Sequence, residues 1–278
     1  MTENPNIDIV RIRPYLQDHG NAPGGVQLRF NPNMLRRFRQ YLALLEEHYD
    51  EALLDPEDVI RQELRDTEIG GYATPHVILG AEYNDPDDPG LEPTLLAAAS
   101  GNVIPFRTRE DHTTGSYKAA VQFVSYAVPE VPRRGSLIFF ALGGLVSELS
   151  NITRLRRRTD EGDVIEADGE RAVQVYRSWG FRVLDGVDYV QPPLDWTRDG
   201  RPKKEARELT LMWKPVDEDQ VTVHNAMLTP FADALFDWYT PEQEVMSDTA
   251  YERLEKHVDA LRQRFHESIA ERTFIDIF

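Results

Sequence analysis

Tyr176 is the residue whose type and position point most clearly to chemistry. Ala172, Val175, Tyr176 and Trp179 stand at i, i+3, i+4 and i+7, so the spacing predicts a short helix with one apolar stripe. Gly180 follows and is expected to take the left-handed conformation that ends a helix. A phenol on such a stripe points inward and needs a hydrogen-bond partner. The pattern therefore predicts either a functional phenol or a core tyrosine with a structural hydrogen bond.

A second candidate site lies in residues 126–142, YAVPEVPRRGSLIFFAL. The segment reads as a strand, a turn and the start of a helix. Free backbone N–H groups at a helix N-terminus bind anions such as a pyrophosphate. We expect the helix to run from Ser136 to about Arg158. The alternative is a strand over residues 135–142 followed by a helix that begins at Gly143 and Gly144, because glycine disfavours a helix interior.

The other reactive residue types form no convincing site. Glu82, Asp111 and His112 are the candidates for a general base, although an exposed Asp–His pair is more often solvated than catalytic. The remaining histidines are dispersed and lack metal-ligand spacing, so no metal site is expected. There is no cysteine, which excludes disulfides and a cysteine nucleophile. Nucleotide-binding and serine-hydrolase fingerprints are absent as well.

Composition sets the class of protein and of partner. With 278 residues and 41% hydrophobic content, the chain can bury a sizeable core. It has no run of eighteen apolar residues and no basic, apolar leader, so we expect a cytoplasmic protein without a membrane partner. A net charge of −17 with only five lysines is typical of a genome-composition or salt-adaptation effect. The functional alternative is that an acidic surface disfavours nucleic acid and favours a cationic small molecule or a basic peptide.

Periodicity and turn residues predict an alternation of strands and helices. The expected order is β, α, α, β, β, β, α, β, α, β, β. Strands are expected over residues 7–15, 76–83, 93–106, 117–130, 164–167, 181–187 and 208–214, and helices over 34–54, 55–66, 136–158 and 170–179. Residues 93–106 form either one strand or a strand pair. The sequence thus predicts an α/β (α+β) domain over residues 1–216.

The C-terminal part, residues 217–278, is expected to be a helical extension. One helix is predicted over 225–239, and capping patterns at Thr240 and Thr249 predict further helix starts. The helix opened at Thr249 has an apolar seam, formed by Tyr251, Leu254, Val258, Leu261 and Phe265. Three roles are open for this seam: packing back onto the core, forming a homodimer interface, or covering an acceptor site.

Three of these segments together resemble a known family. The pattern A-x-x-h-Y-x-x-x-G-F, residues 172–181, resembles the fourth-helix motif of the GCN5-related N-acetyltransferase superfamily, and LMWKP at 211–215 resembles its closing strand. Residues 127–135 are similar to the family's cofactor loop, with Pro129, Glu130, Arg134 and Gly135 at matching positions. The resemblance implies a mixed, mostly antiparallel central sheet flanked by helices.

The resemblance also implies an activity and a set of site residues. It implies transfer of an acyl group from acetyl-CoA to an amine, on a small molecule or a peptide, by direct attack on the thioester. Tyr176 matches the tyrosine that protonates the departing thiolate, which is reasonable because a phenol stays protonated at neutral pH. The implied cofactor-binding residues are Tyr126, Ala127, Val128, Arg133, Arg134, Gly135 and Ser136.

Two departures from the family's loop leave other functions open. Pro132 removes one backbone N–H, and Leu137 places a bulky side chain where phosphate and backbone should come close. The alternative is therefore a non-catalytic binding or assembly protein of the same fold. Transfer to a protein or a tRNA is a third hypothesis, and the acidic balance argues against tRNA.

Overall fold

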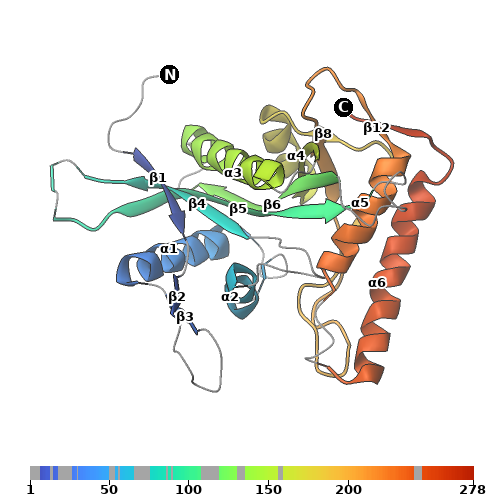
Figure 1. The fold of residues 1–278 in the computed structure, drawn as a ribbon, viewed down its shortest axis with the longest axis horizontal. Coiled ribbons are helices and arrows are strands. Elements are labelled where there is room, and N and C mark those ends of the chain that lie inside the picture. Colours follow the sequence, from blue (N-terminus) through green and yellow to red (C-terminus); the bar gives the residue numbers. More distant parts are fainter. Residues whose placement is uncertain are drawn as a thin grey trace. The chain divides into compact units, whose positions relative to one another are not determined.

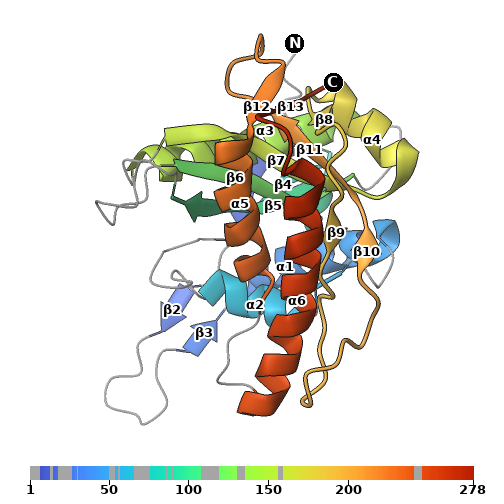
Figure 2. The same cartoon turned by 90° about the vertical axis from the view of Figure 1, so that its right-hand side faces the viewer.

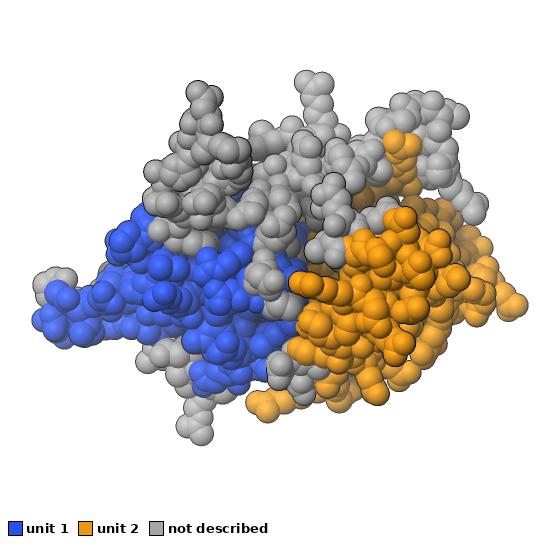
Figure 3. Space-filling model, turned by 90° about the horizontal axis from the view of Figure 1, so that it is seen from below, with its two compact units in different colours: residues 1–102, 125–149 blue, residues 103–124, 150–278 orange. Residues whose placement is uncertain are grey.

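The chain divides into two compact units in the computed structural model. Residues 1–102 and 125–149 form the first unit, and residues 103–124 and 150–278 form the second (Figure 3). The structure describes residues 7–12, 15–17, 27–29, 31–49, 54–55, 57–65, 76–85, 87–88, 90–107, 119–129, 135–155, 159–240 and 246–278. Two strands and one helix contribute residues to both units.

A seven-stranded sheet has the strand order β1-β4-β5-β6-β7-β11-β8 (Figure 1). Its strands are β1 Ile7–Ile12, β4 Val77–Tyr83, β5 Thr94–Phe106, β6 Ala119–Pro129, β7 Thr159–Ala167, β11 Thr210–Lys214 and β8 Arg182–Val183. Four of its strand pairs are antiparallel: β1 with β4, β4 with β5, β7 with β11, and β11 with β8. The pair β6 and β7 is parallel. The sheet is therefore mixed and mostly antiparallel, as expected from the sequence.

Six helices and three short strand pairs complete the described part of the chain. The helices are α1 Pro32–His48, α2 Glu57–Arg65, α3 Gly135–Leu155, α4 Gly169–Ser178, α5 Asn225–Trp238 and α6 Asp248–Ile269. The short pairs are β2 Tyr15–Gln17 with β3 Gln27–Arg29, β9 Val190–Gln191 with β10 Arg207–Glu208, and β12 Thr222–His224 with β13 Phe274–Asp276. The seven sheet strands and helices α1 to α4 follow the predicted order.

The first unit places helices on both faces of its strands. Adjacent residues of a strand point to opposite faces. Ile78 of β4 is buried with Phe38 and Tyr41 of α1, whereas Leu79 faces Gly144 of α3. Figure 1 shows α1 and α3 on opposite sides of β4 and β5 accordingly.

Helix α3 is continuous through the two glycines in its middle, so the predicted helix is confirmed and the alternative strand is wrong. A Cβ atom on Gly144 would lie only 3.2 Å from Cδ1 of Leu79. The missing side chain therefore lets the helix approach the sheet closely. This close packing offsets the low helix propensity of glycine.

In the second unit, α5 and α6 pack side by side (Figure 2). The rings of Phe236 and Phe265 join them at 6.3 Å between centroids. Phe231 of α5 contacts Trp213 of β11 at 5.7 Å, so the C-terminal helices pack onto the strands of their own unit. Helix α6 begins one residue before Thr249, and its cap is Ser247, whose side chain accepts from the N–H of Ala250. The predicted cap at Thr249 is wrong by two residues.

Two further expectations concern the capping pattern at Thr240 and membrane-spanning helices. The capping pattern at Thr240 extends into residues 241–245, which lie outside the described residues. Among the helices that the structure describes, none combines the length and the apolar character needed to cross a membrane.

Candidate functional site

Tyr176 lies on the buried side of α4. Its side chain is buried, and its ring is 5.2 Å from the ring of Trp179 and 6.5 Å from that of Phe181. The predicted stripe needs one correction, because Val175 is 41% exposed and Val173 is buried in its place. The buried positions are thus three residues apart, which suits a helix of less than three turns lying on a sheet.

The end of α4 has the predicted geometry. Gly180 has φ of +89°, the left-handed conformation that a residue with a side chain rarely adopts. The N–H of Gly180 donates to the carbonyl of Arg177 at 3.0 Å, and the N–H of Phe181 donates to that of Tyr176 at 3.1 Å. These bonds satisfy carbonyl groups at the helix end and turn the chain directly into β8.

Of the predicted cofactor-binding residues, Tyr126 and Val128 of β6 are buried in the core formed with α1 and α2. The Tyr126 hydroxyl donates to Oδ2 of Asp55 at 2.8 Å and accepts from the N–H of Asp55 at 2.9 Å. Burial and the charge of Asp55 raise the pKa of Tyr126 well above its usual value. The Tyr126 side chain therefore ties β6 to the segment before α2, and its phenol stays neutral.

The neighbouring positions on β6 point to the other face. Ser125 alternates with Tyr126, and its hydroxyl is buried without a hydrogen-bond partner among the described residues. The N–H of Ala127 donates to the hydroxyl of Tyr49 at 3.2 Å. Pairing between β6 and β7 ends at Val124, although β6 continues to Pro129. The end of β6 thus has a stretch of backbone beyond its β7 partners.

The residues after β6 complete the expected cofactor segment. Arg133 and Arg134 lie outside the described residues, whereas Gly135 and Ser136 form the first turn of α3. The first N–H groups of a helix have no partner within it and favour a negative charge. The orphaned hydroxyl of Ser125 and this helix start are features that an extended amide-containing thioester with a pyrophosphate would satisfy. The residues present therefore fit an acyl-CoA.

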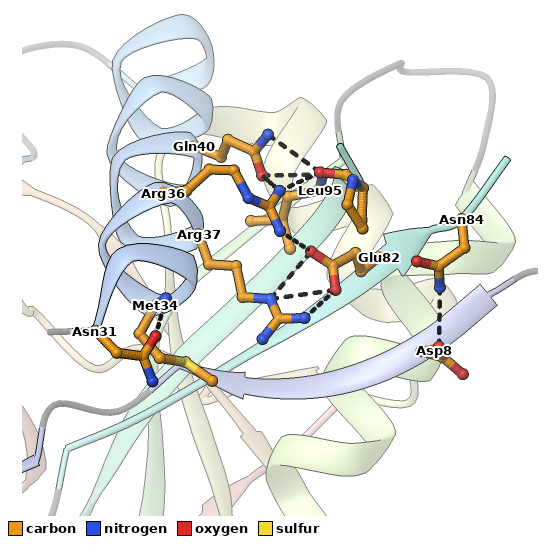
Figure 4. Close-up of polar contacts among 10 residues, drawn as sticks. Asp8, Asn31, Met34, Arg36, Arg37, Gln40, Glu82, Asn84 and Leu95 are labelled. Carbon is orange, nitrogen blue, oxygen red and sulfur yellow. Dashed lines mark hydrogen bonds and ion pairs between the residues drawn. The ribbon is translucent and has the colours of Figure 1, made fainter. Parts of the chain in front are cut away.

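The predicted base Glu82 lies in an ion-pair cluster of the first unit (Figure 4). Its carboxylate accepts from Nη2 of Arg36 at 2.9 Å and from Nε of Arg37 at 3.0 Å. Burial works to raise the pKa of Glu82, but the hydrogen bonds from Arg37 and Arg36 outweigh burial and lower it. A carboxylate held in this way is a poor proton acceptor. Asp111 and His112 lie outside the described residues.

A polar cluster that the sequence reasoning missed surrounds Glu166 of β7. The hydroxyl of Tyr189 donates to its Oε1, Nε2 of Gln191 donates to its Oε2 at 2.8 Å, and the hydroxyl of Tyr239 lies 2.9 and 3.0 Å from its two oxygens. Burial and the charge of Glu166 raise the pKa of Tyr189 well above its usual value, so this phenol remains a donor. The three partners lie more than 20 residues from Glu166 in the sequence, so no local motif predicts the cluster.

Strand register places this Glu166 cluster and the α4 residues on opposite faces of β7 and β11. Glu166 is paired with Leu211, on the face where Trp213 meets α5. Lys214 is on the other face, with Nζ 6.0 Å from the ring of Phe181, which in turn contacts Tyr176. The phenol of Tyr176 and the carboxylate of Glu166 therefore lie on opposite faces of these two paired strands.

Another carboxylate, that of Asp163, is buried in the middle of β7. Burial raises its pKa to about 7; Lys214 opposes the shift and Asp160 adds to it. Asp160 accepts from Nε2 of Gln122 at 2.8 Å and from the hydroxyl of Ser150 at 3.1 Å. In the described part of the chain, no group of three or more histidine or acidic side chains could hold a metal ion.

Comparisons with known proteins give structural similarities. No protein-family model and no curated protein matches the sequence. Among solved structures, Arabidopsis thaliana NAA60 in complex with acetyl-CoA is 12% identical, with 76% of this chain and 98% of that chain covered and a TM-score of 0.46. The same protein in complex with a bisubstrate analogue is 14% identical, with 74% of this chain and 96% of that chain covered and a TM-score of 0.43. An N-acetyltransferase from Staphylococcus aureus Mu50 is 15% identical, with 77% of this chain and 99% of that chain covered and a TM-score of 0.37.

The fold follows from the chain's own topology. The sheet strands and helices α1 to α4 follow the order predicted from periodicity, and the sheet is mixed with a parallel β6–β7 pair, as the resemblance implies. Helix α3 connects β6 to β7 and α4 follows β7, so both motif segments occupy their expected elements. The chain therefore has the mixed, mostly antiparallel sheet flanked by helices that the resemblance to the GCN5-related N-acetyltransferases implies.

Proposed function

We propose that this protein is an acyl-CoA-dependent N-acyltransferase that transfers an acetyl group to an amine. The observation that carries the proposal is the succession of β6, with its stretch beyond the β7 ladder, and α3, which begins at Gly135. An added extended ligand can pair its amides with free strand backbone, and its pyrophosphate can accept from the first N–H groups of a helix.

The proposed chemistry uses one group on each face of β7. The amine nitrogen forms a bond to the thioester carbonyl carbon, the carbon–sulfur bond breaks, and the departing sulfur takes a proton. Tyr176 is the proposed donor of that proton or hydrogen bond, because a phenol is protonated at neutral pH. The carboxylate of Glu166 is the proposed attraction for the cationic acceptor. The ammonium must first give a proton to solvent, since an alkyl ammonium has no lone pair. The proton that the nitrogen loses after the attack then returns to the phenol of Tyr176 through solvent.

Binding of the acyl donor is tested by titrating acetyl-CoA into the full chain and measuring heat and the thermal midpoint. We expect saturable binding and a raised midpoint, because a ligand that binds only the folded state stabilises it. Absence of both signals at millimolar acetyl-CoA would contradict the proposal.

The role of Tyr176 is tested by Tyr176→Phe, with Tyr251→Phe on α6 as a matched control. Tyr176→Phe is expected to lower kcat by about tenfold or more while acetyl-CoA binding stays unchanged, because the lost hydroxyl acts on the leaving sulfur. The control variant should keep full activity. An unchanged kcat in Tyr176→Phe would make the phenol a core residue.

A non-catalytic protein of the same fold is the second candidate. It is favoured by the bond from the N–H of Ala127 to the hydroxyl of Tyr49, which occupies a backbone donor on β6. This candidate predicts no acetyl-CoA binding in the native chain and none in Tyr49→Phe.

A further inference from the structure

The second unit contains a pocket that the proposed reaction does not use. It has a volume of about 530 Å³, within the range of small-molecule sites. Its walls come from the end of α4, from β8, from the end of β11 and from residues 215–221 and 277–278. The lining residues that the argument uses are Arg177, Phe181, Arg182, Lys214, Glu218 and Phe278.

Three cationic side chains line this pocket from three different elements: Arg177 from α4, Arg182 from β8 and Lys214 from β11. Within the described part of the chain, none of the three forms an ion pair with a carboxylate. Nε of Arg177 is buried without a hydrogen-bond partner in that same part. An unpaired buried donor is costly unless a ligand satisfies it.

Arg182 is held rigidly at the edge of the pocket. Its Nη1 donates to the carbonyl of Gln220 at 2.5 Å and its Nη2 donates to the carbonyl of Glu218 at 2.5 Å. Both partners are neutral carbonyl groups, so the positive charge of Arg182 is not cancelled. The side chain of Glu218 is the one acidic side chain among the lining residues, and Glu218 is an exposed residue.

Lys214 and the end of α4 also leave the pocket cationic. Lys214 interacts with Asp163, yet burial keeps the pKa of that carboxyl near 7, so near neutral pH it carries only part of a negative charge. The carbonyls of Tyr176 and Arg177 at the helix end accept from main-chain N–H groups. The negative pole of α4 is therefore partly satisfied by its own chain.

The rest of the wall is apolar. Phe181 is buried, whereas Phe278 and Val221 are 57% and 63% exposed. The guanidinium of Arg177 lies 5.5 Å from the ring centroid of Phe278, a cation–π contact. Exposed apolar surface beside unpaired positive charge suits a ligand with an apolar body and an anionic head.

We propose that this pocket binds a small organic oxyanion, a carboxylate or a phosphate ester, whose apolar group packs on Phe278 and Val221. The oxyanion accepts from Arg177 and Lys214, and Arg182 contributes its charge. Although the chain has a net charge of −17, no described carboxylate forms an ion pair with these three cations, so their positive charge is left for an external anion.

The proposal is tested by calorimetric titration of the full chain with phenylacetate, phenyl phosphate, inorganic phosphate and the neutral phenylacetamide. We expect one of the two aromatic anions to bind with a dissociation constant on the order of 1 mM or tighter. Phenylacetamide should bind at least about tenfold more weakly, because it is neutral and loses the charged contact with Arg177 and Lys214. Tighter binding of phenylacetate identifies a carboxylate, and tighter binding of phenyl phosphate identifies a phosphate ester.

Variants locate the binding. Arg177→Gln and Lys214→Gln should each weaken it by about fivefold or more, whereas Arg171→Gln on an exposed part of α4 should not change it. Val221→Trp fills the mouth of the pocket without removing a charge and should also weaken binding; because Val221 is exposed, folding tolerates the change. Equal binding of phenylacetamide, competition with acetyl-CoA, saturation by inorganic phosphate alone, or unchanged affinity in all three pocket variants would overturn the proposal.

Discussion

At the residue scale, two of the carboxylates of β7, those of Glu166 and Asp163, show how hydrogen bonding and burial give the same chemical group different properties. Glu166 receives three donors from Tyr189, Gln191 and Tyr239. Asp163 is buried, and the pKa of its carboxyl rises to about 7. Donors favour the charged form of a carboxylate and burial disfavours it. Near neutral pH, the carboxyl of Asp163 is thus suited to lose or gain a proton, whereas that of Glu166 is held by its hydrogen-bond donors.

The raised pKa of Asp163 makes stability depend on pH. In the unfolded chain its carboxyl ionises near about 3.9, so between about pH 4 and 7 the native state holds a proton that the unfolded state has lost. The free energy of unfolding therefore falls as pH rises through this window. Burial raises the pKa of Glu161 too, and its contribution has the same sign.

Asp163→Asn should remove most of this decrease. We expect the variant to be more stable than the native chain at pH 8, by roughly 1 to 3 kcal/mol, and equal to it near pH 3. Urea unfolding across this pH range measures the difference, with Glu252→Gln on the exposed side of α6 as control. A variant that is less stable than the native chain at pH 8 would show that the ionised Asp163 is stabilising.

Glu166→Gln tests the acceptor side of the proposed reaction. The substitution keeps the shape of the side chain but removes its charge, so kcat/KM for a cationic amine should fall by about tenfold, mainly through KM. Glu170→Gln, an exposed change on α4, serves as control. If Glu166→Gln keeps the native KM, the cluster has only a structural role.

At the element scale, the sequence predicted what local signals specify. The stripe of α4, apart from Val175, and the helical character of residues 135–155 were readable, because periodicity acts over a few residues. The approach of Leu79 that explains Gly144 involves a strand about 65 residues away in sequence, and no local pattern encodes it.

The same distinction applies to the candidate site: residues in local motifs could be predicted, and residues whose role depends on distant partners could not. Tyr176 and the β6–α3 segment have local motifs, and the structure places them in the expected elements. Their roles in binding and catalysis stay predictions. Glu166, Ser125 and Tyr49 could not be found from the sequence, because their meaning depends on partners brought together by the sheet and by α1.

The stretch of β6 beyond its β7 partners gives a prediction with opposite signs at two positions. In Ser125→Ala, loss of an unpartnered buried hydroxyl should leave stability equal or higher but weaken acetyl-CoA binding by a few fold. In Tyr49→Phe, the N–H of Ala127 is freed and acetyl-CoA binding should tighten by up to about tenfold. Calorimetry and urea unfolding measure both quantities. Unchanged acetyl-CoA affinity in both variants would show that the cofactor does not contact this part of β6.

At the scale of the whole molecule, the net charge of −17 is expected to select the acceptor. An acidic protein attracts cationic ligands, and salt screens this attraction over about 8 Å at physiological ionic strength. Acceptors with two or three amino groups should therefore show kcat/KM values that fall more steeply with added salt than those of a monoamine. Initial rates at several salt concentrations measure the two slopes. Equal slopes would show that charge does not guide the acceptor.

The C-terminal helices raise the question of the oligomeric state of the whole molecule. Leu254, Val258 and Phe265 of α6 are buried within the second unit, so the apolar seam is at least partly covered by the chain itself. A homodimer through these helices stays a prediction, which sedimentation at several protein concentrations checks.

The central claim is that the chain moves an acetyl group from a thioester to an amine. The most direct measurement incubates the purified chain with acetyl-CoA and a panel of diamines, basic peptides and neutral amines, and follows release of free thiol together with the mass of each amine. The account predicts thiol release that depends on the amine, with one added acetyl group on a cationic acceptor, and a strong decrease in Tyr176→Phe. Acetyl-CoA that stays intact with every amine, or thiol release without a modified amine, would contradict it.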